Sequence, residues 1–258
     1  MSGFIESPYS PNAFHVARSA RRVTVLATWS KADAFVPPGR MNEMQNQLYK
    51  GMKRHHFSKE ELDAIHRHYD DELAGKNRRG KEVRYWENVV EGEELPPVVK
   101  GPLDITDTCA GMLVEYNYAF AIKWAVMRQA IESYPIDPQT GEYRYRRDWH
   151  LDDALAQAAG VPYAFQIGKY SEMLLGHVVS NWMGDDGFVK VMDFQLRRIN
   201  IIGDMNWLKG RVTKKYVKDG EHLVDLDIWS ENQDGIVITK GTATVRLVAM
   251  SGEEITGS

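Results

Sequence analysis

The chain has 258 residues, 43% of them hydrophobic and 26% charged, which is enough apolar material for a core and enough charge for a soluble surface. A net charge of -4 gives no electrostatic basis for binding nucleic acid. The single cysteine, Cys109, excludes an internal disulfide framework and is typical of a reducing cytoplasm. No Cys/His cluster has zinc spacing, so we expect neither a metal nor another cofactor.

No apolar run is long enough to cross a bilayer, because the longest one, Tyr116 to Ile131, is interrupted by Lys123 and Arg128. We therefore expect a cytoplasmic protein without a membrane partner. Residues 1–41 are rich in Ser, Pro and Ala, and only Val23 to Trp29 has the composition of a short strand. This composition predicts either an extended arm that packs on the body or on a partner, or disorder.

A capping box at Ser58 and Glu61 predicts the start of a helix over Lys59 to Leu73, with the polar side carrying His66 and His68. The arm and this helix form a predicted N-terminal extension over residues 1–80. Thr106 or Asp107 is expected to N-cap a long apolar helix over Ala110 to Ile131. Two further helix signals follow: Asp152 and Asp153 before a short helix ending at Gly160, and Gly168 before an apolar helix.

The last third of the chain has β character. Strands are predicted at 188–196, 207–217, 223–230 and 236–247, with Asp-Gly turns at 219–220 and 234–235. Val224, Leu226 and Ile228 alternate with polar or partly polar residues, as in a sheet with one covered face. Helices followed by an antiparallel meander predict an α+β fold in which a long helix lies on a curved antiparallel sheet.

From Tyr85 to Leu247 the chain resembles the MaoC-like hydratases and dehydratases, which have the hot-dog fold. The segments that carry the resemblance occur in the family's order: YWENVVEGEELP, LDITDTCAGML, WHLDDALAQAAGVP, FQIGKYSEMLL and SENQDGIVITKGTATV. The resemblance implies that residues 81–258 form a hot-dog domain. It also implies a lyase that hydrates an enoyl-CoA in a degradation pathway, or dehydrates the 3-hydroxyacyl-CoA.

The implied site centres on His150, because His titrates near neutral pH and can deprotonate water. Asp148 is its predicted orienting carboxylate, since residues two apart on an extended chain share a face. The Gly168 N–H, at the positive end of a helix, is predicted to hold the thioester oxygen. Tyr116 and His177 are candidates for the same cavity. The competing interpretations are an ordinary histidine at 150, a core histidine at 177, close packing at Gly168, and a core residue at Tyr116.

One departure from the family pattern leaves the activity open. Counting back from His150, Tyr145 and Arg147 occupy the positions of the family's Asp and Asn. The first alternative is therefore a non-catalytic subunit that pairs with a catalytic MaoC-like partner. A second is a hot-dog thioesterase using Glu172 on the central helix. An exposed sheet edge leads us to expect a homodimer or higher oligomer, or pairing with a second MaoC-like subunit.

Overall fold

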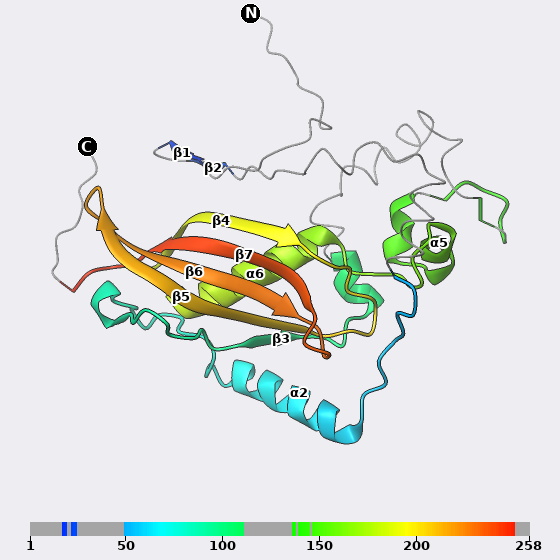
Figure 1. Ribbon diagram of the computed structural model, residues 1–258, viewed down its shortest axis with the longest axis horizontal. Helices are drawn as coiled ribbons and strands as arrows, with labels where there is room; N and C mark the ends of the chain where they lie inside the picture. Colours follow the sequence, from blue (N-terminus) through cyan, green and yellow to red (C-terminus); the bar gives the residue numbers. More distant parts are fainter. Residues whose placement is uncertain are drawn as a thin grey trace, which may run out of the picture.

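The computed structural model describes residues 17–19, 22–24, 49–110, 136–137, 139–144 and 146–250 (Figure 1). Tyr116 and nearly all of the helix predicted over residues 110–131 lie outside this part of the chain. The strand predicted at Val23 to Trp29 overlaps β2 (Arg22–Thr24), which pairs antiparallel with β1 (Ala17–Ser19). In the described residues, no helix has the length and apolar character needed to cross a membrane.

Five strands form one antiparallel sheet in the order β3-β5-β6-β7-β4. Their bounds are Val98–Lys100 for β3, Phe188–Leu196 for β4, Asn206–Lys218 for β5, Glu221–Glu231 for β6 and Val237–Arg246 for β7. Strands β5, β6 and β7 are the predicted meander. Strand β4 lies beside β7, and β3 occupies the other edge of β5, so the strand order does not follow the chain order.

The turns of the meander follow the sequence prediction in part. Asp219 and Gly220 both have positive φ values, 51° and 78°, as a two-residue hairpin turn of this kind requires. In the second turn only Gly235 has a positive φ, 72°. This turn is one residue longer than predicted: the Gly235 N–H donates to the Asn232 carbonyl and the Asn232 N–H donates to the Ile236 carbonyl, so positive φ is needed only at the glycine.

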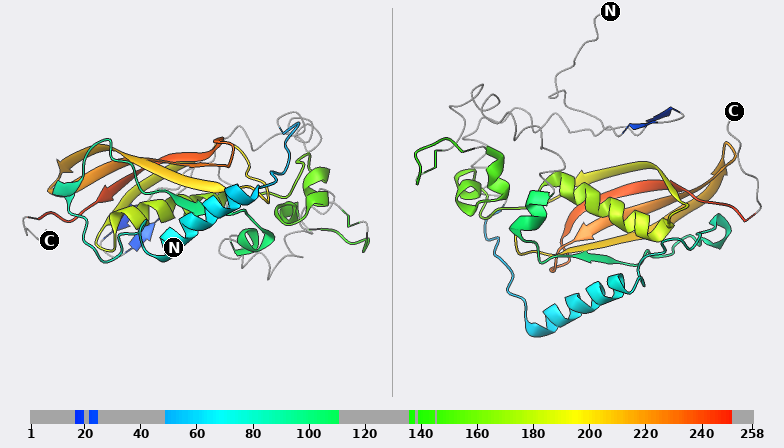
Figure 2. Two further views of the ribbon diagram at one scale, coloured as in Figure 1. Left: turned by 90° about the horizontal axis from the view of Figure 1, so that it is seen from below. Right: turned by 180° about the vertical axis from the view of Figure 1, so that it is seen from behind.

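Helix α6 (Gly168–Met183) lies against one face of the sheet, as both views in Figure 2 show. Its buried apolar side chains meet the inward-facing side chains of the strands in one core, in which a fully buried Val, Leu or Ile contributes about 1.5–3 kcal/mol. The core members from α6 and the meander are Leu174, Leu175, Val178, Val179, Trp182, Leu208, Val212, Val224, Leu226, Ile228, Ala243 and Val245. A long helix held by an antiparallel sheet confirms the predicted α+β hot-dog fold.

The N-terminal helix α2 (Lys59–Leu73) lies along β3, the short edge strand (Figure 1). Its capping box is formed as predicted, with Ser58 Oγ accepting from the Glu61 N–H and Glu61 Oε2 accepting from the Ser58 N–H. The Tyr69 hydroxyl bonds both the carbonyl and the N–H of Gly101, at 2.9 and 2.8 Å. Helix α2 thereby covers a sheet edge that otherwise invites pairing with another chain.

Two local predictions need correction. The helix expected to begin after Thr106 or Asp107 begins at Ile105, because Asp104 and Asp107 bond each other's backbone N–H groups reciprocally. His68, expected on a solvated face, is half-buried and packs edge-on against Trp207, with ring centroids 5.0 Å apart.

The close approach of β4 and β7 at Gly241 gives a stability prediction. A Cβ atom there would lie 2.0 Å from the Asp193 carbonyl oxygen and 2.9 Å from the Phe194 Cα. Gly241→Ala is expected to lower the free energy of unfolding by about 1–3 kcal/mol or more, measured by urea unfolding. Gly176→Ala in α6, where nothing lies within 4 Å, is the control and should stabilise by about 0.5–1 kcal/mol. Equal stability of Gly241→Ala and wild type would contradict this strand spacing.

Candidate active site

A cavity of about 440 Å³ lies at the N-terminal end of α6. Its wall combines residues from η4 (Arg146–His150), from the segment before α6 and from the end of β4. The lining residues that matter for chemistry are Trp149, His150, Gln166, Gly168, Ser171 and Asn200. The cavity therefore brings together His150 and Gly168, two of the residues singled out from the sequence.

His150 is 8% exposed and is held by its surroundings in one orientation. Its Nδ1 atom lies 2.8 Å from the Phe165 carbonyl oxygen, and its ring packs edge-on against the Phe165 ring at 4.4 Å. Because a carbonyl oxygen only accepts, Nδ1 carries the hydrogen and Nε2 is the basic nitrogen of the neutral ring. A backbone carbonyl thus helps to orient the imidazole.

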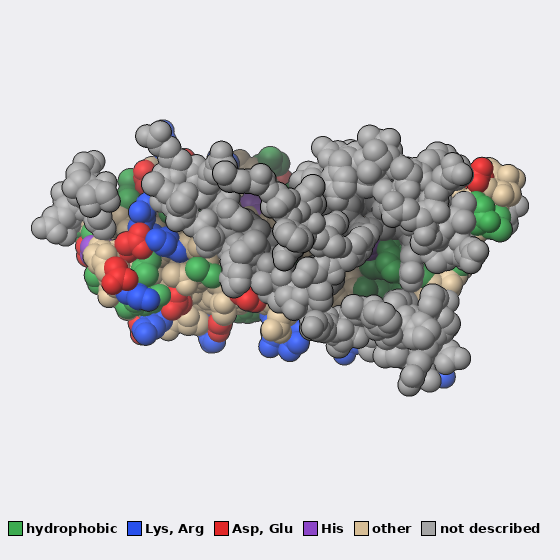
Figure 3. Space-filling model, turned by 90° about the horizontal axis from the view of Figure 1, so that it is seen from above, with side chains coloured by type: hydrophobic (Ala, Val, Ile, Leu, Met, Phe, Trp, Pro, Cys, Tyr) green, Lys and Arg blue, Asp and Glu red, His purple; other side chains and the backbone are tan. Residues whose placement is uncertain are grey.

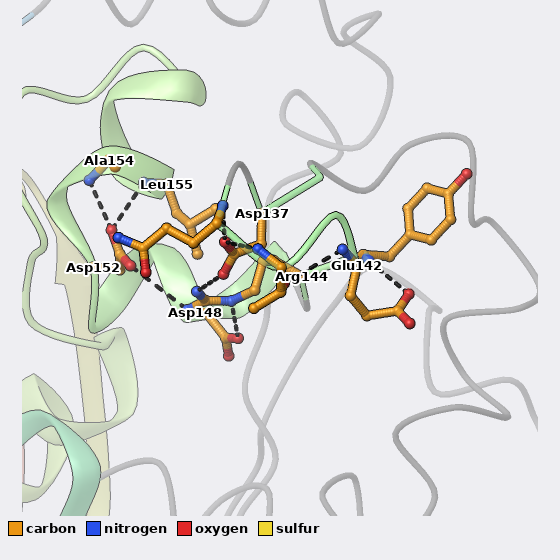
Figure 4. Close-up of polar contacts among 10 residues, drawn as sticks. Asp137, Glu142, Arg144, Asp148, Asp152, Ala154 and Leu155 are labelled. Atoms are coloured by element: carbon orange, nitrogen blue, oxygen red, sulfur yellow. Dashed lines mark hydrogen bonds and ion pairs between the residues drawn. The ribbon is translucent and has the colours of Figure 1, made fainter.

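The prediction that Asp148 and His150 share a face was based on an extended chain, and the local geometry is different. Both residues lie in η4, a 3-10 helix, in which side chains repeat every third residue. The Asp148 carboxylate faces Arg144, whose Nε lies 3.5 Å away. Figure 4 shows Asp137, Asp148 and Asp152 arranged around the Arg144 guanidinium, with Asp137 at 2.8 Å and Asp152 at 3.6 Å.

The Arg144 cluster connects the loop before η4 to the start of α5 (Asp153–Ala158). The hydrogen bond from Arg144 lowers the pKa of the Asp137 carboxyl below its ordinary value. Asp152 is the N-cap of α5, as predicted, and accepts from the backbone N–H groups of Ala154 and Leu155. Gly160 follows the end of α5 with φ 86°, which fits the C-terminal role predicted for it. Arg144 therefore links residues on both sides of His150.

Gly168 is the first residue of α6, and its N-cap, Ile167, offers no side-chain hydrogen bond. The first N–H groups of an α-helix have no partner within the helix, and they lie at its positive end. A Cβ atom on residue 168 would lie 2.7 Å from Leu196 Cδ1, so glycine leaves room for Leu196 beside the helix start. The start of α6 presents backbone donors to the cavity without a competing cap.

A chain of four buried polar side chains runs from the cavity wall into the sheet, and sequence reasoning missed it. Gln166 Nε2 donates to Ser171 Oγ at 2.5 Å, and Asn206 Nδ2 donates to Gln166 Oε1 at 2.7 Å. The Ser230 hydroxyl donates to Asn206 Oδ1 at 3.0 Å. All four residues are at most 5% exposed. The signal available in the sequence was the polar pair Gln166 and Ser171 flanking Gly168 in an otherwise apolar stretch.

His177 and Glu172 do not line this cavity. A helix turns about 100° and rises about 1.5 Å per residue, so His177, nine positions after Gly168, lies on the opposite side and roughly 13 Å along the axis. Its Nε2 is 3.5 Å from Glu72 Oε1, and Glu72 also pairs with Lys100 at 2.8 Å. Glu172 forms an ion pair with Lys169 at 2.8 Å.

The environment of His177 predicts how stability depends on pH. Burial lowers the pKa of His177, nearby Lys100 and Arg78 lower it further, and Glu72 acts in the opposite direction. The unfolded chain therefore takes up this proton at higher pH than the native protein. We expect the free energy of unfolding to fall as the pH decreases through the ordinary His pKa of about 6.5.

His177→Asn is expected to show a smaller loss of stability than wild type between pH 8 and pH 5.5, measured by urea unfolding at each pH. His66→Asn, which removes an exposed histidine from α2, serves as the control. A His177→Asn profile parallel to that of wild type would contradict the predicted effect of burial.

Charges of both signs are mixed over the described part of the face shown in Figure 3, which agrees with the small net charge. Arg197 and Arg198 are exposed and line the cavity. They are the cationic side chains at the cavity for which no ion pair with another described residue is found. The cavity thus has a cationic side next to its histidine.

No family model and no curated protein matches the chain. Among solved structures, it is similar to the (R)-hydratase PhaJ1 of Pseudomonas aeruginosa, at 15% identity and a TM-score of 0.48 over 64% of this chain and 86% of that one. The MaoC-like dehydratase of Rhodospirillum rubrum is 14% identical, with a TM-score of 0.46 over 64% and 97% of the two chains. One chain of the ChsH1–ChsH2 complex of Mycobacterium tuberculosis is 19% identical, with a TM-score of 0.45 over 62% of this chain and 98% of that one. At these identities the similarity is one of fold alone, and the activities in the names are those of the other proteins.

Proposed function

We propose that the cavity at the start of α6 adds water across the double bond of an α,β-unsaturated acyl-CoA thioester, or catalyses the reverse dehydration. The observation that supports this proposal is the shared cavity of His150 and Gly168. A buried imidazole with its tautomer set by a backbone carbonyl is suited to a general base. An uncapped helix start is suited to an oxygen that gains negative charge.

In the proposed reaction, His150 Nε2 removes a proton from water while the water oxygen bonds to the β-carbon. The electrons of the double bond move toward the thioester oxygen, which the Gly168 N–H stabilises. The imidazolium then gives its proton to the α-carbon, so that one water is added in full. Asp148, implied as the partner of His150, is proposed to act at a distance by holding η4 through Arg144.

The two exposed arginines at the cavity support the proposal that the substrate is a CoA thioester. Arg197 and Arg198 follow directly after β4 and line the same space as His150. Guanidinium groups bind phosphate oxygens through paired hydrogen bonds, and CoA carries three phosphate groups on its nucleotide end. We therefore propose that the nucleotide lies toward residues 197–198 and the acyl group toward His150.

The test is an assay of the purified full chain with short, aromatic and steroid-like enoyl-CoAs, following the loss of the conjugated thioester absorbance. Turnover of any member of this panel is the expected result. A well-folded chain that turns over none of them would overturn the self-sufficient hydratase and favour the non-catalytic subunit.

Two observations favour that alternative: Arg144 lies 3.5 Å from the Asp148 carboxylate, and Tyr145 and Arg147 occupy the family's Asp and Asn positions. The thioesterase alternative is tested in the same reactions by measuring free thiol with a chromogenic disulfide. If the wild-type chain releases thiol but leaves the conjugated double bond intact, and Glu172→Gln no longer releases thiol, the result would support hydrolysis over hydration.

A further inference from the structure

The buried chain of Gln166, Ser171, Asn206 and Ser230 has a defined direction of donation. The Ser230 hydroxyl and the Gln166 carboxamide lie on the two sides of the Asn206 side chain. With Asn206 Oδ1 accepting from Ser230, its Nδ2 faces Gln166 Oε1, and Gln166 Nε2 then faces Ser171. Each amide accepts on one side and donates on the other. Ser171 Oγ is therefore an acceptor within the chain, and its own proton remains to be donated.

The position of Ser171 determines where that proton can go. Ser171 is three residues after Gly168, so both lie on the same side of α6. Side chains on a helix lean toward its N-terminus, which brings the Ser171 hydroxyl back toward the first N–H groups. Gly168 and Ser171 both line the cavity. Within the described residues, Gln166 is the side chain that hydrogen-bonds to Ser171 Oγ.

Burying four polar side chains costs free energy unless each of them forms hydrogen bonds. Asn206 is 0% exposed and Ser230 is 1% exposed, and both project polar groups into the core beneath α6. In such surroundings each hydrogen bond polarises the next, so the last hydroxyl becomes a stronger donor than an isolated serine. The hydroxyl lies at the cavity wall near Gly168, where the proposed function places the thioester oxygen.

Resting on the proposed function, we propose that Ser171 is a second donor to the thioester oxygen beside the Gly168 N–H, and that Gln166, Asn206 and Ser230 position its hydroxyl. The water addition itself is unchanged: the Ser171 proton stays on its oxygen and is shared with the enolate oxygen while the negative charge is present. The hydrogen bond from Ser171 strengthens as that oxygen becomes negative, so loss of the hydroxyl should lower mainly kcat.

The first experiment compares Ser171→Ala with Ser180→Ala, which removes an exposed hydroxyl from the same helix. Ser171→Ala is expected to lower kcat by about 10²-fold, with KM within a few-fold of wild type. Ser171→Thr, which keeps the hydroxyl, should restore most of the activity. Ser230→Ala, at the far end of the hydrogen-bonded series, should lower kcat by roughly two- to fivefold. Ser180→Ala should match wild type.

A second readout does not require turnover. Acetoacetyl-CoA, a 3-oxoacyl thioester, forms an enolate with a near-ultraviolet absorbance, and a pair of donors at its thioester oxygen shifts it toward that form. The wild-type chain and Ser180→Ala should raise this absorbance, and Ser171→Ala should raise it much less at equal saturation.

The outcomes separate this inference from the function on which it rests. Turnover and enolate absorbance that are both unaffected in Ser171→Ala would overturn the role of Ser171 and leave the hydratase intact. A wild-type chain that lacks turnover but shows a Ser171-dependent enolate signal would support the donor pair and overturn the hydration reaction. Absence of both signals in wild type would overturn both proposals.

Discussion

His150→Asn is expected to lower kcat/KM for hydration by about 10²- to 10⁴-fold, the contribution typical of one general acid–base group. The Asn side chain places an amide nitrogen near the position of Nδ1, where it can keep the hydrogen bond to the Phe165 carbonyl. It has no basic nitrogen to replace Nε2. The substitution therefore removes proton transfer while preserving much of the local structure.

The measurement is the steady-state hydration rate on the best substrate of the enoyl-CoA panel, with urea unfolding to show that the variant is folded. His68→Asn is the matched control, since it removes a half-buried histidine that packs on Trp207, away from the cavity. Its kcat/KM should stay close to that of wild type. A folded His150→Asn variant within threefold of wild type would remove His150 from the mechanism and, with it, the main support for a lyase.

Trp182→Ala is expected to lower the free energy of unfolding by about 3–5 kcal/mol, the largest stability effect predicted for this chain. Trp182 is 1% exposed and is one of the largest side chains in the core between α6 and the sheet. Its indole Nε1 donates to Glu93 Oε1 at 3.0 Å, and the Arg84 guanidinium lies 4.5 Å from the ring centroid. Arg84 in turn pairs with Glu93 at 2.9 Å.

Removal of the ring therefore leaves a cavity and withdraws support from a half-buried ion pair. The loss is a large share of the roughly 5–15 kcal/mol that stabilises an ordinary domain. Trp182→Phe keeps most of the packing but not the hydrogen bond, and should cost clearly less than the alanine substitution. Urea unfolding of both variants measures the two contributions. A Trp182→Ala variant within 1 kcal/mol of wild type would contradict the placement of α6 on the sheet.

Several elements were predictable because the signals lie within a few residues of one another. The capping box of Ser58 and Glu61 sets the start of α2, and the alternation of Val224, Leu226 and Ile228 sets the covered face of β6. The strand predicted over residues 188–196 has the same bounds in β4. These patterns reflect hydrogen bonds and side-chain directions that the local chain settles by itself. The family resemblance added the hot-dog fold and drew attention to His150 and Gly168.

The site could be predicted only in part, because its geometry depends on segments far apart in the chain. Asp148 was assigned to His150 by sequence proximity on an extended chain, but both residues lie in the 3-10 helix η4, and Arg144 Nε is 3.5 Å from the Asp148 carboxylate. His177 shares α6 with Gly168, yet the helical rotation sends it toward Glu72 on α2. Whether two residues on different elements meet is decided by packing summed over the whole molecule.

The sequence by itself determined most of the local elements and the α+β class, since these follow from short-range periodicity and residue type. Only the tertiary structure decided that β4 lies beside β7, that the Phe165 carbonyl orients His150, and that Ser230 and Asn206 reach Gln166 beneath α6. Strand order and buried polar contacts join residues distant in sequence. Their free energies depend on the complete core, which no short stretch of residues contains.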